Sequence, residues 1–196
     1  MSIQEENMQA YEQLLPIFLA EAEELFGPKN DYIFIGIGYH NHPPRMYMFD
    51  KDPFSGEEYY KVDLYGVGAI NDRKDGIFQL SHEVVHLLSP VPQDTDENDV
   101  NRVNYLEEGM ATYFAKRVTE RETADYDFCN NAMLKDEKYF TAYMRYQSLK
   151  EIDTEAVKKL RTIQPIIPLI QAEDFVAAGL DVPQNLINAL LEKFPE

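Results

Sequence analysis

The sequence predicts one α+β domain, because a helical segment comes first, short strands follow, and helices fill the rest of the chain. Its 196 residues can form one sizeable core and leave little room for a second. Hydrophobic residues make up 44% and charged residues 27%, which is typical of a globular chain. We therefore predict a single domain over 1–196, with a helix and a small, mostly antiparallel sheet in 1–75, two site-bearing helices in 76–120 and a helical part in 121–196.

Residues 3–26 are expected to form the first helix. Their apolar positions recur at spacings of three and four, which is typical of an amphipathic helix: Leu14, Leu15, Phe18, Leu19, Ala22 and Phe26. Pro16 either kinks this helix or starts its second part. Gly27 and Pro28 end it.

Three β-branched and aromatic runs, 31–39, 45–50 and 59–65, predict the strands of the sheet. The connections between them contain proline, glycine and asparagine, which favour turns. A further segment, 65–70, is predicted to be a short edge strand whose glycines allow a bulge or the close approach of another backbone.

Helices are expected over the remainder of the chain. Two of them, over 76–88 and 102–120, are separated by an acidic, proline-containing loop at 89–99. Later helices are predicted near 131–151, 153–163 and 184–194, with an interruption between the last two at Pro165 and Pro168.

The run S-H-E-V-V-H at 81–86 is the strongest chemical signal in the chain. On a helix, His82 and His86 stand on one face and can offer two imidazoles to one ion. Glu83 projects about 100° from His82, so that it can reach a metal-bound water without being a ligand. The alternative is an ordinary helix with one buried and one exposed histidine.

A catalytic zinc site needs a third protein ligand, and L-E-E-G-M-A at 106–111 supplies two adjacent acids. Together with H-E-V-V-H, this segment resembles the gluzincin metallopeptidases, which include the aminopeptidase-N-like and thermolysin-like enzymes. In the aminopeptidase-like branch the third ligand is the glutamate of an E-G-x-A pattern, which matches Glu108. The resemblance covers roughly 76–117 and implies a zincin-like fold, one Zn²⁺ per chain and hydrolysis of peptide bonds.

The helical faces also favour Glu108 over Glu107 as the ligand. Glu108 shares its face with small side chains, which would let the second helix lie close to the first, whereas Glu107 shares a bulkier face. Two features depart from the family pattern. The 21 residues at positions 87–107 are somewhat more than is usual between the second histidine and the third ligand, and Thr112 stands where thermolysin-like enzymes have an acid that orients a zinc histidine.

The resemblance implies that Glu83 is the general base that takes a proton from the zinc-activated water and later delivers it to the leaving nitrogen. Gluzincins often use a tyrosine or histidine as a further donor to the oxyanion. The sequence leaves this residue open among Tyr105, Tyr113, Tyr126, Tyr139, Tyr143, His40 and His42.

The net charge of −17 disfavours nucleic acid and anionic membranes as partners and favours cations and basic peptides. The single cysteine, Cys129, allows no disulfide within the chain. The N-terminus has acids where a signal peptide has positive charge, and no apolar run is long enough to span a membrane, so we expect a cytoplasmic protein. Export without a cleavable signal stays open, and so does the oligomeric state.

The leading hypothesis is therefore a zinc peptidase that acts on a peptide or protein substrate. One alternative is a zincin used for binding or regulation with little turnover, although a merely structural zinc would not need Glu83. Another is a secreted effector or toxin protease with one protein target, which the compact size would suit.

Overall fold

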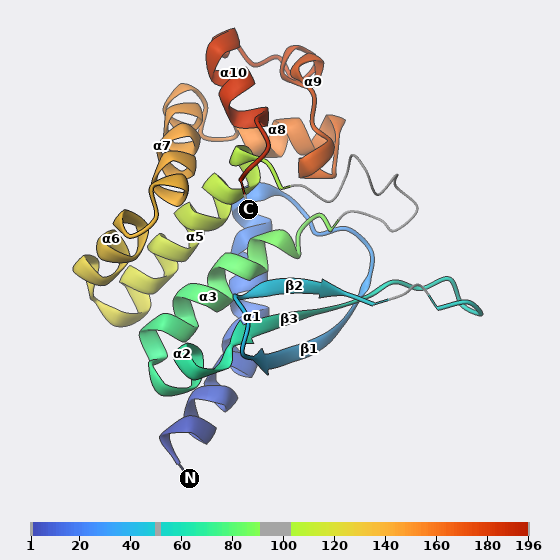
Figure 1. Ribbon diagram of the computed structural model, residues 1–196. Helices are drawn as coiled ribbons and strands as arrows, with labels where there is room; N and C mark the ends of the chain where they lie inside the picture. The colour runs from blue at the N-terminus through green and yellow to red at the C-terminus, as the bar shows by residue number, and fades with distance from the viewer. Residues whose placement is uncertain (1, 50–51, 91–102, 196) are drawn as a thin grey trace.

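The computed structural model describes residues 2–49, 52–90 and 103–195, and in this part of the chain it has an α+β architecture (Figure 1). A three-stranded sheet lies on one side of the helix α3, and the helices from α5 onward lie on the other. The helices are α1 (Ile3–Phe26), α2 (Gly66–Asn71), α3 (Arg73–His86), α5 (Tyr105–Thr123), α6 (Tyr126–Leu134), α7 (Glu137–Ile152), α8 (Ala156–Ile163), α9 (Ala172–Ala177) and α10 (Gln184–Leu191), with a 3-10 turn η1 (Ile167–Leu169).

The first helix, α1, has the predicted extent and continues through Pro16. It begins with a capping box, in which Ser2 and Glu5 each accept a hydrogen bond from the other's backbone N–H. Its apolar stripe is buried against the helices around it, and its buried apolar side chains are Tyr11, Leu15, Phe18, Ala22 and Phe26.

The sheet is mixed, so the expected mostly antiparallel sheet is wrong. Its strands β1 (Ile33–His40), β2 (Arg45–Met48) and β3 (Tyr59–Tyr65) lie in the order β1–β3–β2. β1 runs parallel to β3, and β2 runs antiparallel to it. The connection at 41–44, where a turn was expected, ends in two prolines that favour extended backbone, and it carries the chain past β3. As a result, β2 forms an edge of the sheet and lies beside α3.

The segment predicted as an edge strand at 65–70 is instead largely the short helix α2. Two side chains of α1 hydrogen-bond to its carbonyl groups: Tyr11 donates to Ala69 O at 2.7 Å, and Asn7 donates to Ile70 O at 2.8 Å. These long-range bonds satisfy the backbone groups at the end of the helix, where a six-residue helix is otherwise weak.

Both helices expected to carry the site are present, shifted by about one turn. α3 was expected over 76–88 and begins at Arg73, because the Asp72 side chain caps it by accepting from Lys74 N. α5 was expected over 102–120 and continues to Thr123. The Asn104 side chain caps its N-terminus by accepting from Glu107 N at 3.0 Å. The predicted acidic loop lies outside the described residues from position 91 onward.

In the C-terminal part, the helix predicted over 131–151 is two helices, because Asp136 caps a new helix by accepting from Lys138 N. The helices predicted at 153–163 and 184–194 are found as α8 and α10, and α9 was not predicted. None of the described helices is long and apolar enough to cross a membrane.

Arg161 of α8 ties this C-terminal part to the end of the site-bearing helix α3. Its side chain is buried and donates hydrogen bonds to five backbone carbonyls that close α1, follow α3 or follow α8: Phe26, Gly27, Pro28, Leu88 and Pro165. A guanidinium has five N–H donors in a fixed fork, so one side chain can hold three segments together.

Candidate metal centre

α3 presents His82 and His86 on one face, as their spacing predicted. Their ring centroids are 5.2 Å apart, and both side chains are about nine-tenths buried. The opposite face of α3 places Ile77, Leu80, Val84 and Val85 in the hydrophobic core. The core therefore fixes the rotation of the helix about its axis, and with it the direction of the two imidazoles.

α5 brings Glu108 to the same point. Its carboxylate oxygens lie 3.2 Å from His82 Nε2 and 3.7 Å from His86 Nε2. The sequence thus identified three side chains that the fold does bring together, with ligand atoms all within 4.8 Å of one another. Two atoms bonded to zinc at about 2.05 Å in a tetrahedron are about 3.3 Å apart, close to these separations.

Glu107 has a separate place in this cluster. Its Oε1 accepts a hydrogen bond from His86 Nδ1 at 3.0 Å, on the side of the ring away from Glu108. A proton fixed on Nδ1 leaves the lone pair of Nε2 directed at the ligand position. From the sequence, Glu107 was weighed only as an alternative ligand to Glu108, and the position expected for the orienting acid was that of Thr112. The feature of the sequence that could have indicated this role is the position of Glu107, one residue before the candidate ligand on a buried helix.

The donor set fits a zinc ion, since two imidazole nitrogens and one carboxylate are ligands that zinc accepts. Glu108 Oε2, Glu107 Oε2 and Thr112 Oγ1 are buried and make no hydrogen bond within the described residues. Buried polar atoms normally have a partner. A cation beside Glu108 would supply one and would offset the negative charge of the buried glutamates.

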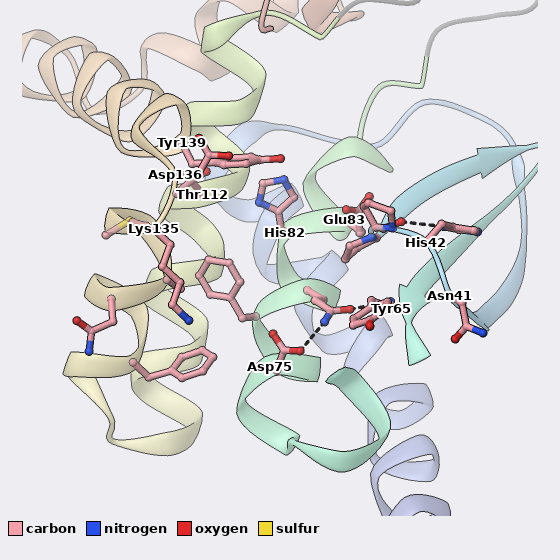
Figure 2. A pocket seen from close by; sticks show the side chains of 18 residues that line it. Asn41, His42, Tyr65, Asp75, His82, Glu83, Thr112, Lys135, Asp136 and Tyr139 are labelled. Atoms are coloured by element: carbon pink, nitrogen blue, oxygen red, sulfur yellow. Dashed lines mark hydrogen bonds between the residues drawn. The ribbon is translucent and has the colours of Figure 1, made fainter. Parts of the chain in front are cut away.

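Glu83 lies beside the two histidines and next to the edge strand. Figure 2 shows it adjacent to His82 on α3. Its carboxylate accepts a hydrogen bond from the backbone N–H of Met46 in β2. Burial raises the pKa of Glu83 above its ordinary value. His86, His82 and the hydrogen bond from Met46 lower this pKa, but burial outweighs them. A carboxylate whose proton affinity is raised is better suited to act as a general base.

Tyr139 is the tyrosine that the fold places at the cluster. Its ring lies 5.9 Å from the His82 ring in an edge-to-face arrangement (Figure 2). Burial, Glu108 and Glu83 raise its pKa, so its hydroxyl stays protonated and can donate a hydrogen bond. The other candidates are engaged or exposed: Tyr113 accepts from Lys150, Tyr143 accepts from Gln147, Tyr105 stacks beneath Arg145, and Tyr126 is exposed.

Gly109 allows α7, and with it Tyr139, to approach this closely. A Cβ at position 109 would lie 2.4 Å from Ala142 O and 2.7 Å from Tyr146 Cβ, so no side chain fits between α5 and α7. The glycine of the E-G-x-A segment therefore has a packing role next to the ligand Glu108.

His40 and His42 form a second cluster with Asp63 of β3 and do not join the first. Their Nε2 atoms lie 3.3 and 3.8 Å from the Asp63 carboxylate, and their rings stack 5.0 Å apart. Lys61 Nζ lies 2.9 Å from Asp63 Oδ1 and 3.4 Å from His40 Nε2. We call these four residues the sheet cluster, and His82, Glu83, His86, Glu107 and Glu108 the helix cluster.

Two cavities border the helix cluster. The larger, of about 740 Å³, extends from His82 and Glu83 along α3 toward α6, and the smaller, of about 300 Å³, lies between β2 and α5. Tyr139 borders both. A ligand at His82 would therefore have open space beside it, as a catalytic metal site requires and a purely structural one does not.

Comparisons with protein-family models, with curated proteins and with solved structures give no significant match.

Proposed function

We propose that the protein is a zinc-dependent peptidase with a zincin-like site. The observation that carries this proposal is the position of Glu83. It lies between the buried ligand set of His82, His86 and Glu108 and the edge strand β2, and it borders both cavities. A zinc ion held only for stability would need neither an acid beside it nor open space.

Each residue of the helix cluster then has a defined task. His82, His86 and Glu108 would hold the ion, and Glu107 fixes the ring of His86. When bound, zinc acts as a Lewis acid that lowers the pKa of water. Glu83 accepts the proton of the attacking water and delivers it to the nitrogen of the peptide bond as that bond breaks.

Tyr139 is the donor that the fold supports for the developing oxyanion. It is protonated, half-buried and on the far side of His82 from Glu83 (Figure 2). Its hydroxyl can donate to the substrate carbonyl oxygen as negative charge develops there. Tyr139→Phe should keep zinc and lower kcat about 100-fold with little change in KM.

The experiment combines metal content with cleavage of peptide libraries by the zinc-loaded full chain. We expect Glu83→Gln to keep one zinc and to lose activity by about 100- to 10,000-fold. His42→Ala is the matched control, since it removes a histidine that borders the larger cavity and belongs to the sheet cluster. Cleavage that survives Glu83→Gln would contradict the proposed mechanism, and zinc binding without any cleavage by wild type would favour a binding or regulatory protein.

A further inference from the structure

The larger cavity extends from the helix cluster along one face of α3 (Figure 2). Its α3 wall is formed by residues at helical spacings: Asp75, Phe78, Gln79, His82 and Glu83. Asp75 precedes His82 by seven residues, which corresponds to about 10 Å along a helix axis. The cavity therefore places a carboxylate roughly one long side chain away from the position where we propose that a peptide bond is cleaved.

Aromatic side chains line the space between these two points. Phe78 of α3 and Phe128 of α6 meet edge to face with ring centroids 6.2 Å apart, and Met133 lies nearby on the same wall. Such walls can cover the methylene chain of a long side chain and stabilise a cation at its end by cation–π contact.

Asp75 has no ion-pair partner at the end of this cavity among the described residues, although Lys135 acts on it electrostatically from beyond ion-pair distance. The half-buried carboxylate accepts one hydrogen bond, from the neutral amide Gln79 Nε2 at 2.8 Å. Gln79 Oε1 in turn accepts the N–H of Tyr65 at 2.9 Å. Across 2–49, 52–90 and 103–195, no cation lies within ion-pair distance of Asp75. An anion that is partly removed from water attracts a cation more strongly than an exposed one does.

We infer that this cavity binds a lysine or arginine side chain of the substrate, with Asp75 pairing with its charge. This inference rests on the proposed function. The chain's net charge of −17 would also draw a basic peptide toward the protein. An aliphatic or aromatic substrate side chain would pack against the walls of the cavity but would leave the Asp75 carboxylate desolvated and without a partner, which is unfavourable.

Lys135 at the α6–α7 junction modulates this preference. It borders the cavity opposite Asp75 and forms no ion pair within the described part of the chain (Figure 2). As a like charge it opposes a basic substrate side chain. Removing the charge of Lys135 should therefore increase the preference for a basic substrate side chain.

Paired peptides that differ only in lysine or norleucine at each position test the inference, because norleucine keeps the carbon chain and lacks the ammonium. With zinc-loaded wild type, we expect one position to favour lysine by about 10- to 100-fold in kcat/KM. Asp75→Asn should reduce that ratio to about one and change cleavage of the norleucine peptide little. Asparagine keeps an oxygen that accepts from Gln79, so the fold is retained, which thermal unfolding checks.

Asp72→Asn is the matched control, since it removes the same charge from the preceding turn outside the cavity and should leave the ratio unchanged. Lys135→Met should raise the ratio about threefold. A wild-type ratio near one, or a ratio that Asp75→Asn does not change, would overturn the inference while leaving the peptidase intact.

The inference can also fail or survive independently of catalysis. If wild type cleaves no peptide, the proposed function fails, and equilibrium binding of the same peptide pair decides the inference. Tighter binding of lysine than norleucine peptides, lost in Asp75→Asn, supports the cavity as a cation subsite, and equal binding contradicts it.

Discussion

The helix cluster and the sheet cluster contain the same ligand chemistry, two histidines and a carboxylate with ligand atoms within 4.8 Å, but in different surroundings. In the helix cluster the three candidate ligands are buried, and no lysine or arginine of the described chain pairs with Glu107 or Glu108. In the sheet cluster the side chains of His40 and His42 are 43% and 32% exposed, and Lys61 forms an ion pair with the carboxylate of Asp63.

The difference shows that residue types alone do not make a metal site. An ammonium group beside Asp63 already supplies the positive charge that a metal would bring, so binding there requires Lys61 to be displaced. The helix cluster has two imidazoles and three buried glutamates, and no lysine or arginine among the described residues forms an ion pair with it, so protons are the competitor that a divalent cation meets there. Five predictions test this difference between the two clusters.

The largest expected effect is the loss of zinc from the helix cluster alone. Wild type should contain one zinc per chain, and His82→Ala and Glu108→Ala should contain none after dialysis, because two ligands are too few for tight binding. Elemental analysis of the purified proteins measures this. His40→Ala and His42→Ala serve as controls and should keep one zinc. Zinc lost with the controls and kept in His82→Ala would reverse the roles of the two clusters.

The second expected effect concerns Glu107, which orients His86 without binding the ion. Glu107→Gln should weaken zinc binding about 10- to 100-fold, because the amide is a weaker acceptor for Nδ1–H. Competition with a chelator of known affinity gives the ratio. Asp63→Asn makes the equivalent change in the sheet cluster and should leave zinc affinity as it is. An unchanged affinity in Glu107→Gln would mean that packing alone positions His86.

The third expected effect comes from removing the ammonium group of Lys61 from the sheet cluster. Lys61→Met should leave the buried Asp63 without its lysine partner, with only the imidazoles of His40 and His42 beside it, and lower the free energy of unfolding by about 1–3 kcal/mol. The same variant should bind a second, weaker zinc through His40, His42 and Asp63. Urea unfolding and calorimetric stoichiometry measure the two effects. If Lys61→Met binds only one zinc, the lysine is not what separates the clusters.

The smallest expected effect is the release of a proton when zinc binds. Burial lowers the pKa of His86, but Glu107, Glu108 and Glu83 outweigh it and raise the pKa to about 10 in the metal-free protein. At pH 8 the ring is therefore protonated before binding, and a ligand must be neutral. Calorimetry in two buffers of different ionisation enthalpy should show about one proton released per zinc.

The same shift predicts how the stability of the metal-free protein changes with pH. A histidine with a raised pKa stabilises the folded state fully below its ordinary pKa of 6.5, and this contribution is lost as pH rises through about 10. Thermal unfolding of the zinc-free chain between these limits should show the loss. Zinc binding with no proton release, together with a flat stability profile, would contradict the assignment of the proton to His86.

Local patterns accounted for much of this molecule. The spacing of four between His82 and His86 fixed their common face, and the E-G-x-A segment singled out Glu108, whose carboxylate the fold places beside them. The first helix and the three strands were also found where the helical period and the β-branched and aromatic runs placed them. Apart from the choice of Glu108, which rested on the resemblance, these features depend on residues close in sequence, whose geometry the backbone alone determines.

Contacts between distant segments were decided only by the tertiary structure. The pairing of β2 on the outer edge of β3 brought Met46 to Glu83, and the close approach of α7 at Gly109 brought Tyr139 to His82. The same packing gave Glu107 its place on His86, made a helix of a segment that reads as a strand, and put Lys61 beside Asp63. No period in the sequence encodes which side chain of one element meets which of another, because that depends on how all the elements pack together.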